Sequence, residues 1–173
     1  MAYNFPGSIL HGEAGEPIFG SYGAPLYSSS MMSQYGIVEV DWGEDDVDIC
    51  AYWVAGNNAP VGYGHTEGGI TETGALAQYW SSSDNTDGGP ETVAVGVTGG
   101  HIPAGTKWRV HLNWFEGGPG TATVTITMHH GDTRSITSTV ARRTNSPANT
   151  SDPGVEITFG PNNTVLSMVL INQ

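Results

Sequence analysis

Alternation of apolar and polar residues over positions 107–128 is the feature that most constrains the fold. Residues 107–115 place four large apolar side chains on one side of an extended chain: Trp108, Val110, Leu112 and Trp114. Residues 121–128 repeat the pattern, with four threonines on the polar side. Successive side chains of a β-strand point to opposite faces, so this period of two predicts two strands. The glycine-rich segment 116–120 between them predicts a hairpin with one wet face.

The composition agrees with strands joined by tight turns. The 173 residues include 25 Gly and 10 Pro, and only 13% are charged. No segment shows the period and caps of a helix. Further strands are predicted at 37–42, 47–55, 75–80, 91–97 and 134–141, and a second hairpin at 155–171. We therefore predict an all-β fold, a β-sandwich of jelly-roll or Greek-key type, over residues 35–173.

Residues 1–34 differ from the remainder of the chain. They mix Gly, Pro, Ser and Tyr with single apolar residues and have no sustained period. We predict an irregular N-terminal arm whose aromatic residues pack either on its own domain or on a neighbouring subunit. The second case favours a homo-oligomer or larger assembly, with the arm contacting other protein subunits.

The charge balance excludes some partners. Five basic residues face 17 acidic ones, which gives a net charge of −12. Nucleic acid and anionic membranes are disfavoured because both require a basic surface. We also see no signal peptide and no apolar run long enough to cross a bilayer. The expected location is a virion or extracellular surface, with the cytoplasm as the alternative. The single cysteine, Cys50, excludes an intrachain disulfide and is expected in the core.

Two acidic segments, 43–48 and 83–91, predict a metal site. Asp46 and Asp48 lie two apart in a predicted strand, so their carboxylates point the same way and repel unless a cation lies between them. Ca²⁺ takes roughly 6–8 oxygen ligands, including backbone carbonyls. The predicted ligands are Asp46, Asp48, Asp84, Asn85, Asp87 and Glu91, with Asp41 and Asp45 as weaker candidates. The alternative is a pair of solvated turns, since Asp, Asn and Gly are ordinary turn residues.

The same two segments resemble known families. Residues 46–53 resemble the D-x-D-L-x-A-x-x strand of the tellurium-resistance (TerD-like) stress proteins, and residues 82–91 are similar to that family's G-D-N-x-x-G-x-G-D-D-E loop. The segments also resemble the D-L-D-L-H strand and the D-D-T-D-G-x-G-P-E loop of a family of secreted bacterial domains. The TerD-like family is a calcium-binding β-sandwich, so the resemblance implies this fold, Ca²⁺ and the six ligands named above.

No enzyme motif accompanies these acids. We find no G-x-S-x-G, no P-loop and no cysteine nucleophile signature. We therefore predict a non-enzymatic calcium-binding module that acts as a structural or interaction subunit, with a virion decoration or fibre protein as the specific hypothesis. The alternatives are an intracellular TerD-like stress protein, a carbohydrate-binding module and a hydrolase. A glycan site would require exposed aromatics from the set Trp42, Tyr52, Trp53, Tyr63, Tyr79, Trp80, Trp108 and Trp114.

Overall fold

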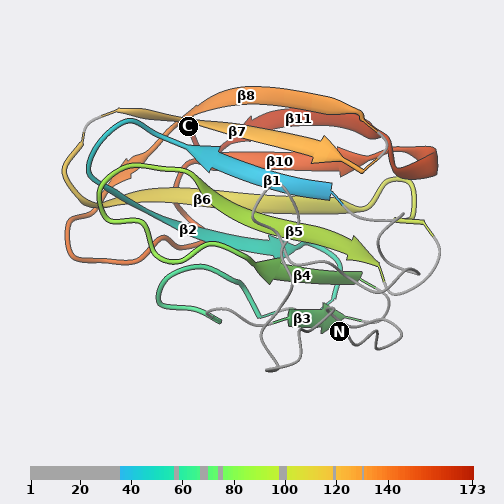
Figure 1. Ribbon diagram of the computed structural model, residues 1–173, viewed down its shortest axis with the longest axis horizontal. Helices are drawn as coiled ribbons and strands as arrows, with labels where there is room; N and C mark the ends of the chain where they lie inside the picture. The colour runs from blue at the N-terminus through green and yellow to red at the C-terminus, as the bar shows by residue number, and fades with distance from the viewer. Residues whose placement is uncertain are drawn as a thin grey trace, which may run out of the picture.

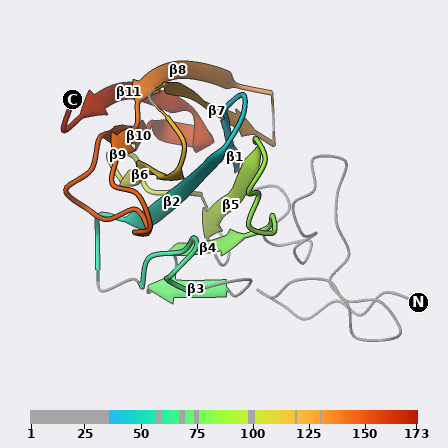
Figure 2. The same ribbon diagram turned by 90° about the vertical axis from the view of Figure 1, so that its left-hand side faces the viewer.

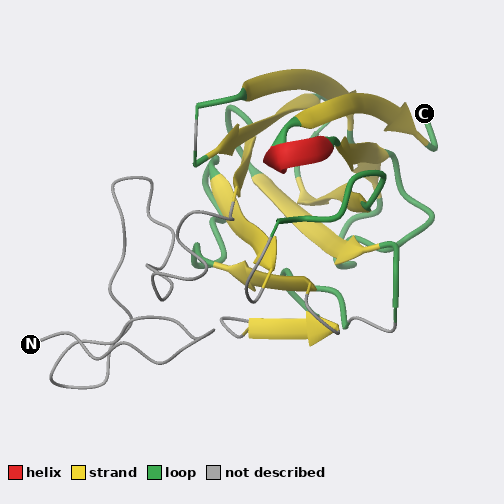
Figure 3. Ribbon diagram, turned by 90° about the vertical axis from the view of Figure 1, so that its right-hand side faces the viewer, coloured by secondary structure: helices red, strands yellow, loops and turns green. Residues whose placement is uncertain are grey.

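The structure is a computed structural model of the chain. It describes residues 36–56, 59–66, 70–73, 76–97, 101–118, 120–129 and 131–173. The predicted arm, residues 1–34, lies outside these ranges. Just over half of the described residues lie in β-strands, which form two sheets, and a three-residue 3-10 helix, Pro161–Asn163, joins the last two strands (Figure 3). None of the helical structure in the described ranges is long and apolar enough to cross a membrane.

Two sheets pack face to face (Figure 1). The first has six strands in the order β3 (Ile70–Thr73), β4 (Leu76–Trp80), β5 (Glu91–Val97), β1 (Gly36–Asp41), β7 (Thr121–Met128) and β8 (Thr133–Thr139). The second has the order β11 (Val165–Ile171), β10 (Gly154–Phe159), β6 (Lys107–Glu116) and β2 (Asp46–Trp53), with β9 (Ala141–Arg142) beside β6. The chain passes repeatedly from one sheet to the other. The predicted all-β sandwich is therefore confirmed.

The core lies between the sheets, and strands such as β1, β2, β5, β6 and β7 contribute alternate side chains to it. Val38 and Val40 of β1 face Ile49 and Ala51 of β2 across it, all four fully buried. Burying each of the Val and Ile side chains contributes about 1.5–3 kcal/mol, and burying Ala51 contributes less. Cys50 is buried as predicted, but on the opposite side of β2 from the core cluster.

The hairpin predicted over residues 107–128 is wrong. β6 pairs with β2 and β10, whereas β7 pairs with β1 and β8 in the other sheet. The connection instead crosses the end of the sandwich, where Gly117 and Gly118 have φ angles of 86° and 76°. A period of two identifies the buried side of a strand but not its neighbour, which explains the error. The predicted hairpin over residues 155–171 is confirmed as β10–β11, and β7 forms a hairpin with β8.

The predicted wet face of β6 is correct at Lys107 and Arg109, which are exposed and partly exposed, but wrong at His111 and Asn113. His111 and Asn113 lie on that face and are buried. The segment 143–153 covers them: Asn113 Nδ2 donates to the Arg143 carbonyl at 3.0 Å, and the His111 ring nitrogen Nδ1 lies 2.8 Å from the Asp152 carbonyl oxygen. A long polar loop therefore satisfies polar residues that the sequence pattern assigned to solvent.

Three connections meet at one end of the sandwich: β1–β2, β4–β5 and β6–β7 (Figure 1, left; Figure 2 faces this end). Gly88 N donates to the Asp45 carbonyl at 2.9 Å, and Gly118 N lies 3.4 Å from Asp45 Oδ2. Gly88 has a φ of 97°, and a Cβ there would lie 2.5 Å from the Gly43 carbonyl oxygen. Glycine thus allows the β4–β5 loop to close onto the acidic β1–β2 turn.

Candidate metal centre

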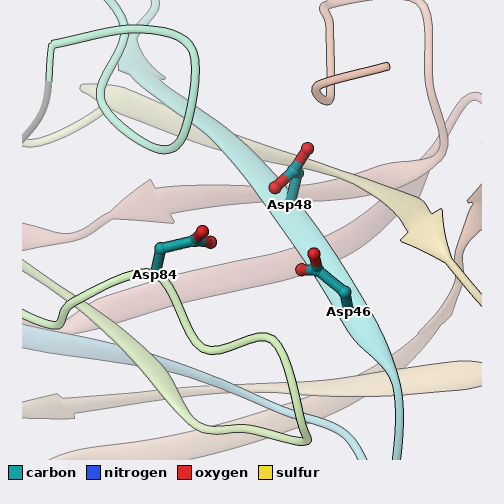
Figure 4. A group of neighbouring side chains, drawn as sticks. All are labelled: Asp46, Asp48 and Asp84. Atoms are coloured by element: carbon teal, nitrogen blue, oxygen red, sulfur yellow. The ribbon is translucent and has the colours of Figure 1, made fainter. Parts of the chain in front are cut away.

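The centre is built from the start of β2 and the β4–β5 loop. The side chains of Val47 and Ile49 point into the core. Asp46 and Asp48 alternate with them along the strand, so their side chains project together from its other side. Asp84 reaches them from the loop that joins two strands of the opposite sheet. Each of these three aspartates offers a carboxylate oxygen, and the three oxygens lie within 4.8 Å of one another. Figure 4 shows the three carboxylates pointing toward a common space.

Asp48 is the most enclosed member of this cluster of Asp46, Asp48 and Asp84. Its side chain is 0% exposed, and neither carboxylate oxygen has a hydrogen-bond partner. Asp46 is also buried, and its Oδ1 has no partner. Asn113 stands opposite Asp48 on β6, but its amide bonds the Arg143 and Ser146 backbone instead. A buried carboxylate without hydrogen bonds or a counter-charge costs several kcal/mol.

The basic residues of the chain are used elsewhere. All five lie within the described ranges, and four form ion pairs. Lys107 and Arg109 pair with Glu156, and Arg143 pairs with Asp152. Among the described residues, no ion pair involves Asp46 or Asp48. The charges of these two buried aspartates are thus not compensated by a basic side chain of the described ranges.

Electrostatics in the cluster favour the protonated acids. Burial, followed by repulsion from Asp46 and Asp84, raises the pKa of Asp48 to about 7. Burial, followed by repulsion from Asp84 and Glu116, raises the pKa of Asp46 to about 6. Glu116 lies opposite Asp46 in the β2–β6 register. A bound divalent cation reverses these shifts, because it favours the charged carboxylates.

Glu91 adds a fourth buried acid beside the cluster. It begins β5 on the side that also carries Val93, and it is fully buried. Its Oε1 accepts a hydrogen bond from Asn85 N at 3.3 Å, whereas Oε2 has no partner. Burial is the main cause that raises its pKa to about 9, and the charges of the three aspartates also raise it. Glu91 therefore lies within electrostatic reach of the cluster but is not one of its three members.

The predicted ligands fall into three groups. The structure brings Asp46, Asp48 and Asp84 together and sets Glu91 next to them. Asn85 orders the loop, since its Nδ2 donates to the Pro90 carbonyl. Asp87 is exposed and lies outside the cluster.

Three further acids, Asp41, Asp45 and Glu116, lie near this end of the sandwich. Asp45 Oδ2 lies 3.4 Å from Gly118 N, and Asp41 is exposed. Glu116 was not among the residues predicted from the sequence. An acid immediately before the Gly-Gly-Pro-Gly turn was the available signal, but its relevance depends on the pairing of β2 with β6.

The donor set defines the kind of ion that fits. Carboxylate oxygens suit hard cations such as Ca²⁺, Mg²⁺ and Mn²⁺, whereas zinc and copper sites use imidazole and thiolate. The cluster contains neither His nor Cys. Comparison of the chain with protein-family profiles, curated proteins and solved structures finds no match. The class that the fold and site define is an all-β sandwich with a carboxylate cluster at one end.

Proposed function

We propose that this protein is a non-enzymatic β-sandwich module that binds Ca²⁺ between Asp46, Asp48 and Asp84. One observation carries the proposal: Asp48 is fully buried, and both of its oxygens lack partners in a cluster of like charges. Folding such a group is costly unless a cation accompanies it. Ca²⁺ fits better than Mg²⁺ because it accepts irregular oxygen shells completed by backbone carbonyls and water.

The ion would act as a structural cross-link. β2 belongs to the five-stranded sheet, whereas the loop that carries Asp84 joins β4 and β5 of the six-stranded sheet. A cation held by both ties the two sheets together at one end of the sandwich. This role supports a structural or interaction subunit, for which a virion decoration or fibre protein remains our specific hypothesis. A TerD-like intracellular stress protein is the alternative that shares the calcium site.

The spacing of the acids favours metal binding over hydrolysis. Glycosidases hold an acid and a base about 5–9.5 Å apart, with the sugar between them. Here three carboxylate oxygens share a space within 4.8 Å. The aromatic residues give little support to a carbohydrate-binding module, because all five tryptophans are buried. Tyr63, at 36% exposure, is the most exposed described aromatic of the predicted set.

Thermal unfolding with and without calcium tests the proposal. Ca²⁺ at 100 times its Kd should stabilise the wild-type chain by about 2.7 kcal/mol relative to chelator. Asp48→Asn keeps the shape but removes a charged ligand, so the response to Ca²⁺ should be lost. Glu44→Gln is the matched control, because Glu44 is an exposed acid in the adjacent turn. Equal melting of the wild type in Ca²⁺ and in chelator would contradict the proposal.

A further inference from the structure

The outer face of the six-stranded sheet has two halves of opposite character. On β7 and β8 the outward side chains all carry hydroxyls: Thr121, Thr123, Thr125, Thr127, Thr133, Ser135, Thr137 and Thr139. They bond to one another across the strands, as between Thr125 Oγ1 and Ser135 Oγ at 2.8 Å. These residues are exposed or partly exposed, as expected for the solvent side of an antiparallel sheet.

On β1, β5 and β4 one row of outward side chains is apolar and buried, although Glu39 and Asp41, further along β1, also face outward and are not buried. The register sets Ile37 beside Ala94 and Ala94 beside Tyr79, so the three form a row across the sheet, away from the core. Ile37 is 8% exposed, Ala94 0% and Tyr79 7%, and none of them belongs to the core cluster. The larger side chains of Ile37 and Tyr79 can shield Ala94 between them from solvent. The Ile37 and Tyr79 side chains stand above the sheet and require a layer of atoms over them.

Three of the described connections contact the other sheet. Val61 pairs with Ala51 of β2, and Gly105 N donates to the Phe159 carbonyl of β10. The segment 143–153 covers β6. The layer over Ile37 and Tyr79 therefore calls for another part of the chain or a partner.

Residues 1–35 have the attachment point, length and composition to supply it. Residue 35 directly precedes Gly36, the first residue of β1 and the neighbour of Ile37. These 35 residues contain two charged side chains, Glu13 and Glu16. They also contain many large apolar groups: Tyr3, Phe5, Ile9, Leu10, Ile18, Phe19, Tyr22, Leu26, Tyr27, Met31, Met32 and Tyr35. Covering an apolar surface with such a segment lowers the free energy, because apolar groups of both are removed from water.

We propose that residues 1–35 cover the outer face of β1, β5 and β4 of their own chain. They form a third layer of the sandwich and leave the hydroxyl-bearing half, on β7 and β8, open to solvent. The proposal does not depend on the calcium site, which is built from β2 and the β4–β5 loop.

Photo-crosslinking of the full-length chain identifies the occupant. Tyr79 is replaced by p-benzoyl-phenylalanine, an aromatic residue that crosslinks to its neighbours on irradiation. Digestion after glutamate cuts at Glu39 and Glu72, which separates the probe from residues 1–35. We expect crosslinks from position 79 to residues 1–35 within one chain, shown by mixing isotope-labelled and unlabelled protein. The same probe at Thr125 should give none. Absence of these crosslinks at position 79, or crosslinks only between two chains, would overturn the proposal.

Limited proteolysis of a charged variant gives an independent test. Ala94→Glu places a carboxylate in the apolar row and should release the cover. Chymotrypsin cleavage within residues 1–35 is expected to become about tenfold faster, equivalent to about 1.4 kcal/mol of lost docking. Thr123→Glu adds the same charge to the hydroxyl-bearing half and should leave the rate unchanged. If Ala94→Glu fails to fold, judged by near-ultraviolet circular dichroism, Ile37→Ser provides the same comparison. Equal cleavage of wild type and variant would contradict the docking.

Discussion

Buried carboxylates occur in two places in this sandwich, and their surroundings are opposite. On β10 and just before it, Glu156 and Asp152 are buried beside basic residues. Lys107 Nζ lies 2.7 Å from Glu156 Oε1, and the Arg143 guanidinium forms two hydrogen bonds with Asp152. At the start of β2, Asp48 is buried at least as deeply, with no hydrogen bond to either oxygen.

The pKa directions follow these surroundings. Burial alone would raise the pKa of Glu156, but the hydrogen bonds and charges of Lys107 and Arg109 lower it overall. Burial and neighbouring aspartates raise the pKa of Asp48 to about 7. The chain therefore solves the problem of a buried acid with protein cations at one place and leaves it unsolved at the other. A net charge of −12 does not by itself explain this contrast, whereas the cation that we propose would compensate the acids at the start of β2.

Removing the partner of a paired acid should have the largest effect. Arg143→Met leaves Asp152 buried without its guanidinium and should cost about 2–3 kcal/mol of unfolding free energy, less than a fully buried pair because Arg143 is partly exposed. The loss should be the same in Ca²⁺ and in chelator. Urea unfolding measures it, and the adjacent exposed Arg142→Met is the control. A loss no greater than that of the control would break the comparison.

Neutralising Asp48 should stabilise the protein in chelator, whereas Arg143→Met destabilises it. Its pKa rises from 3.8 to about 7 on folding, so its favourable contribution is complete below pH 4 and is lost as pH rises through 7. At pH 8 in chelator, the free energy of unfolding of Asp48→Asn should be larger than that of the wild type by roughly 1–3 kcal/mol. At pH 4 the two should be equal. Unfolding across this range in chelator measures the difference, and a variant less stable than wild type at pH 8 would contradict our account of an uncompensated charge.

Glu156→Gln should show the opposite pH dependence, with a smaller change in the free energy of unfolding. A carboxylate whose pKa is lowered by folding contributes stability above its unfolded pKa, and this is lost as pH falls through the folded value. The variant should be less stable than wild type by about 1 kcal/mol at pH 7, because both basic partners are partly exposed. The difference should shrink below pH 4. If it persists in acid, packing rather than charge explains the effect.

Glu116→Gln should produce the smallest change. Glu116 is exposed and acts on Asp46 only through its charge. Its neutralisation should weaken Ca²⁺ binding by about two- to threefold at low salt, and less at high salt. Asp87→Asn removes another exposed acid in the same region and should weaken binding no more than this. A tenfold loss in Asp87→Asn would instead show that Asp87 moves to the ion as a ligand.

The sequence predicted most strands and part of the centre. Alternation located β5, β6 and β7 to within a residue or two, because the period of a strand is a local property. The same local rule placed Asp46 and Asp48 on one side of β2. The pairing of β6 with β2 is not local, so the hairpin with β7 was predicted wrongly and Glu116 was missed. Asp84 was found because the β4–β5 loop is acidic, but its exposed neighbour Asp87 looked identical in sequence.

Calorimetric titration of Ca²⁺ at pH 7 tests the central claim most directly. Asp48 and Glu91 have raised pKa values, so the free protein holds protons that the ion displaces. The heat should therefore differ between two buffers of unequal ionisation enthalpy, with saturable binding in both. Asp48→Asn should show neither saturable Ca²⁺ binding nor a heat that depends on the buffer. Saturable binding with proton release is the result that we predict; no binding at millimolar Ca²⁺ would contradict the account.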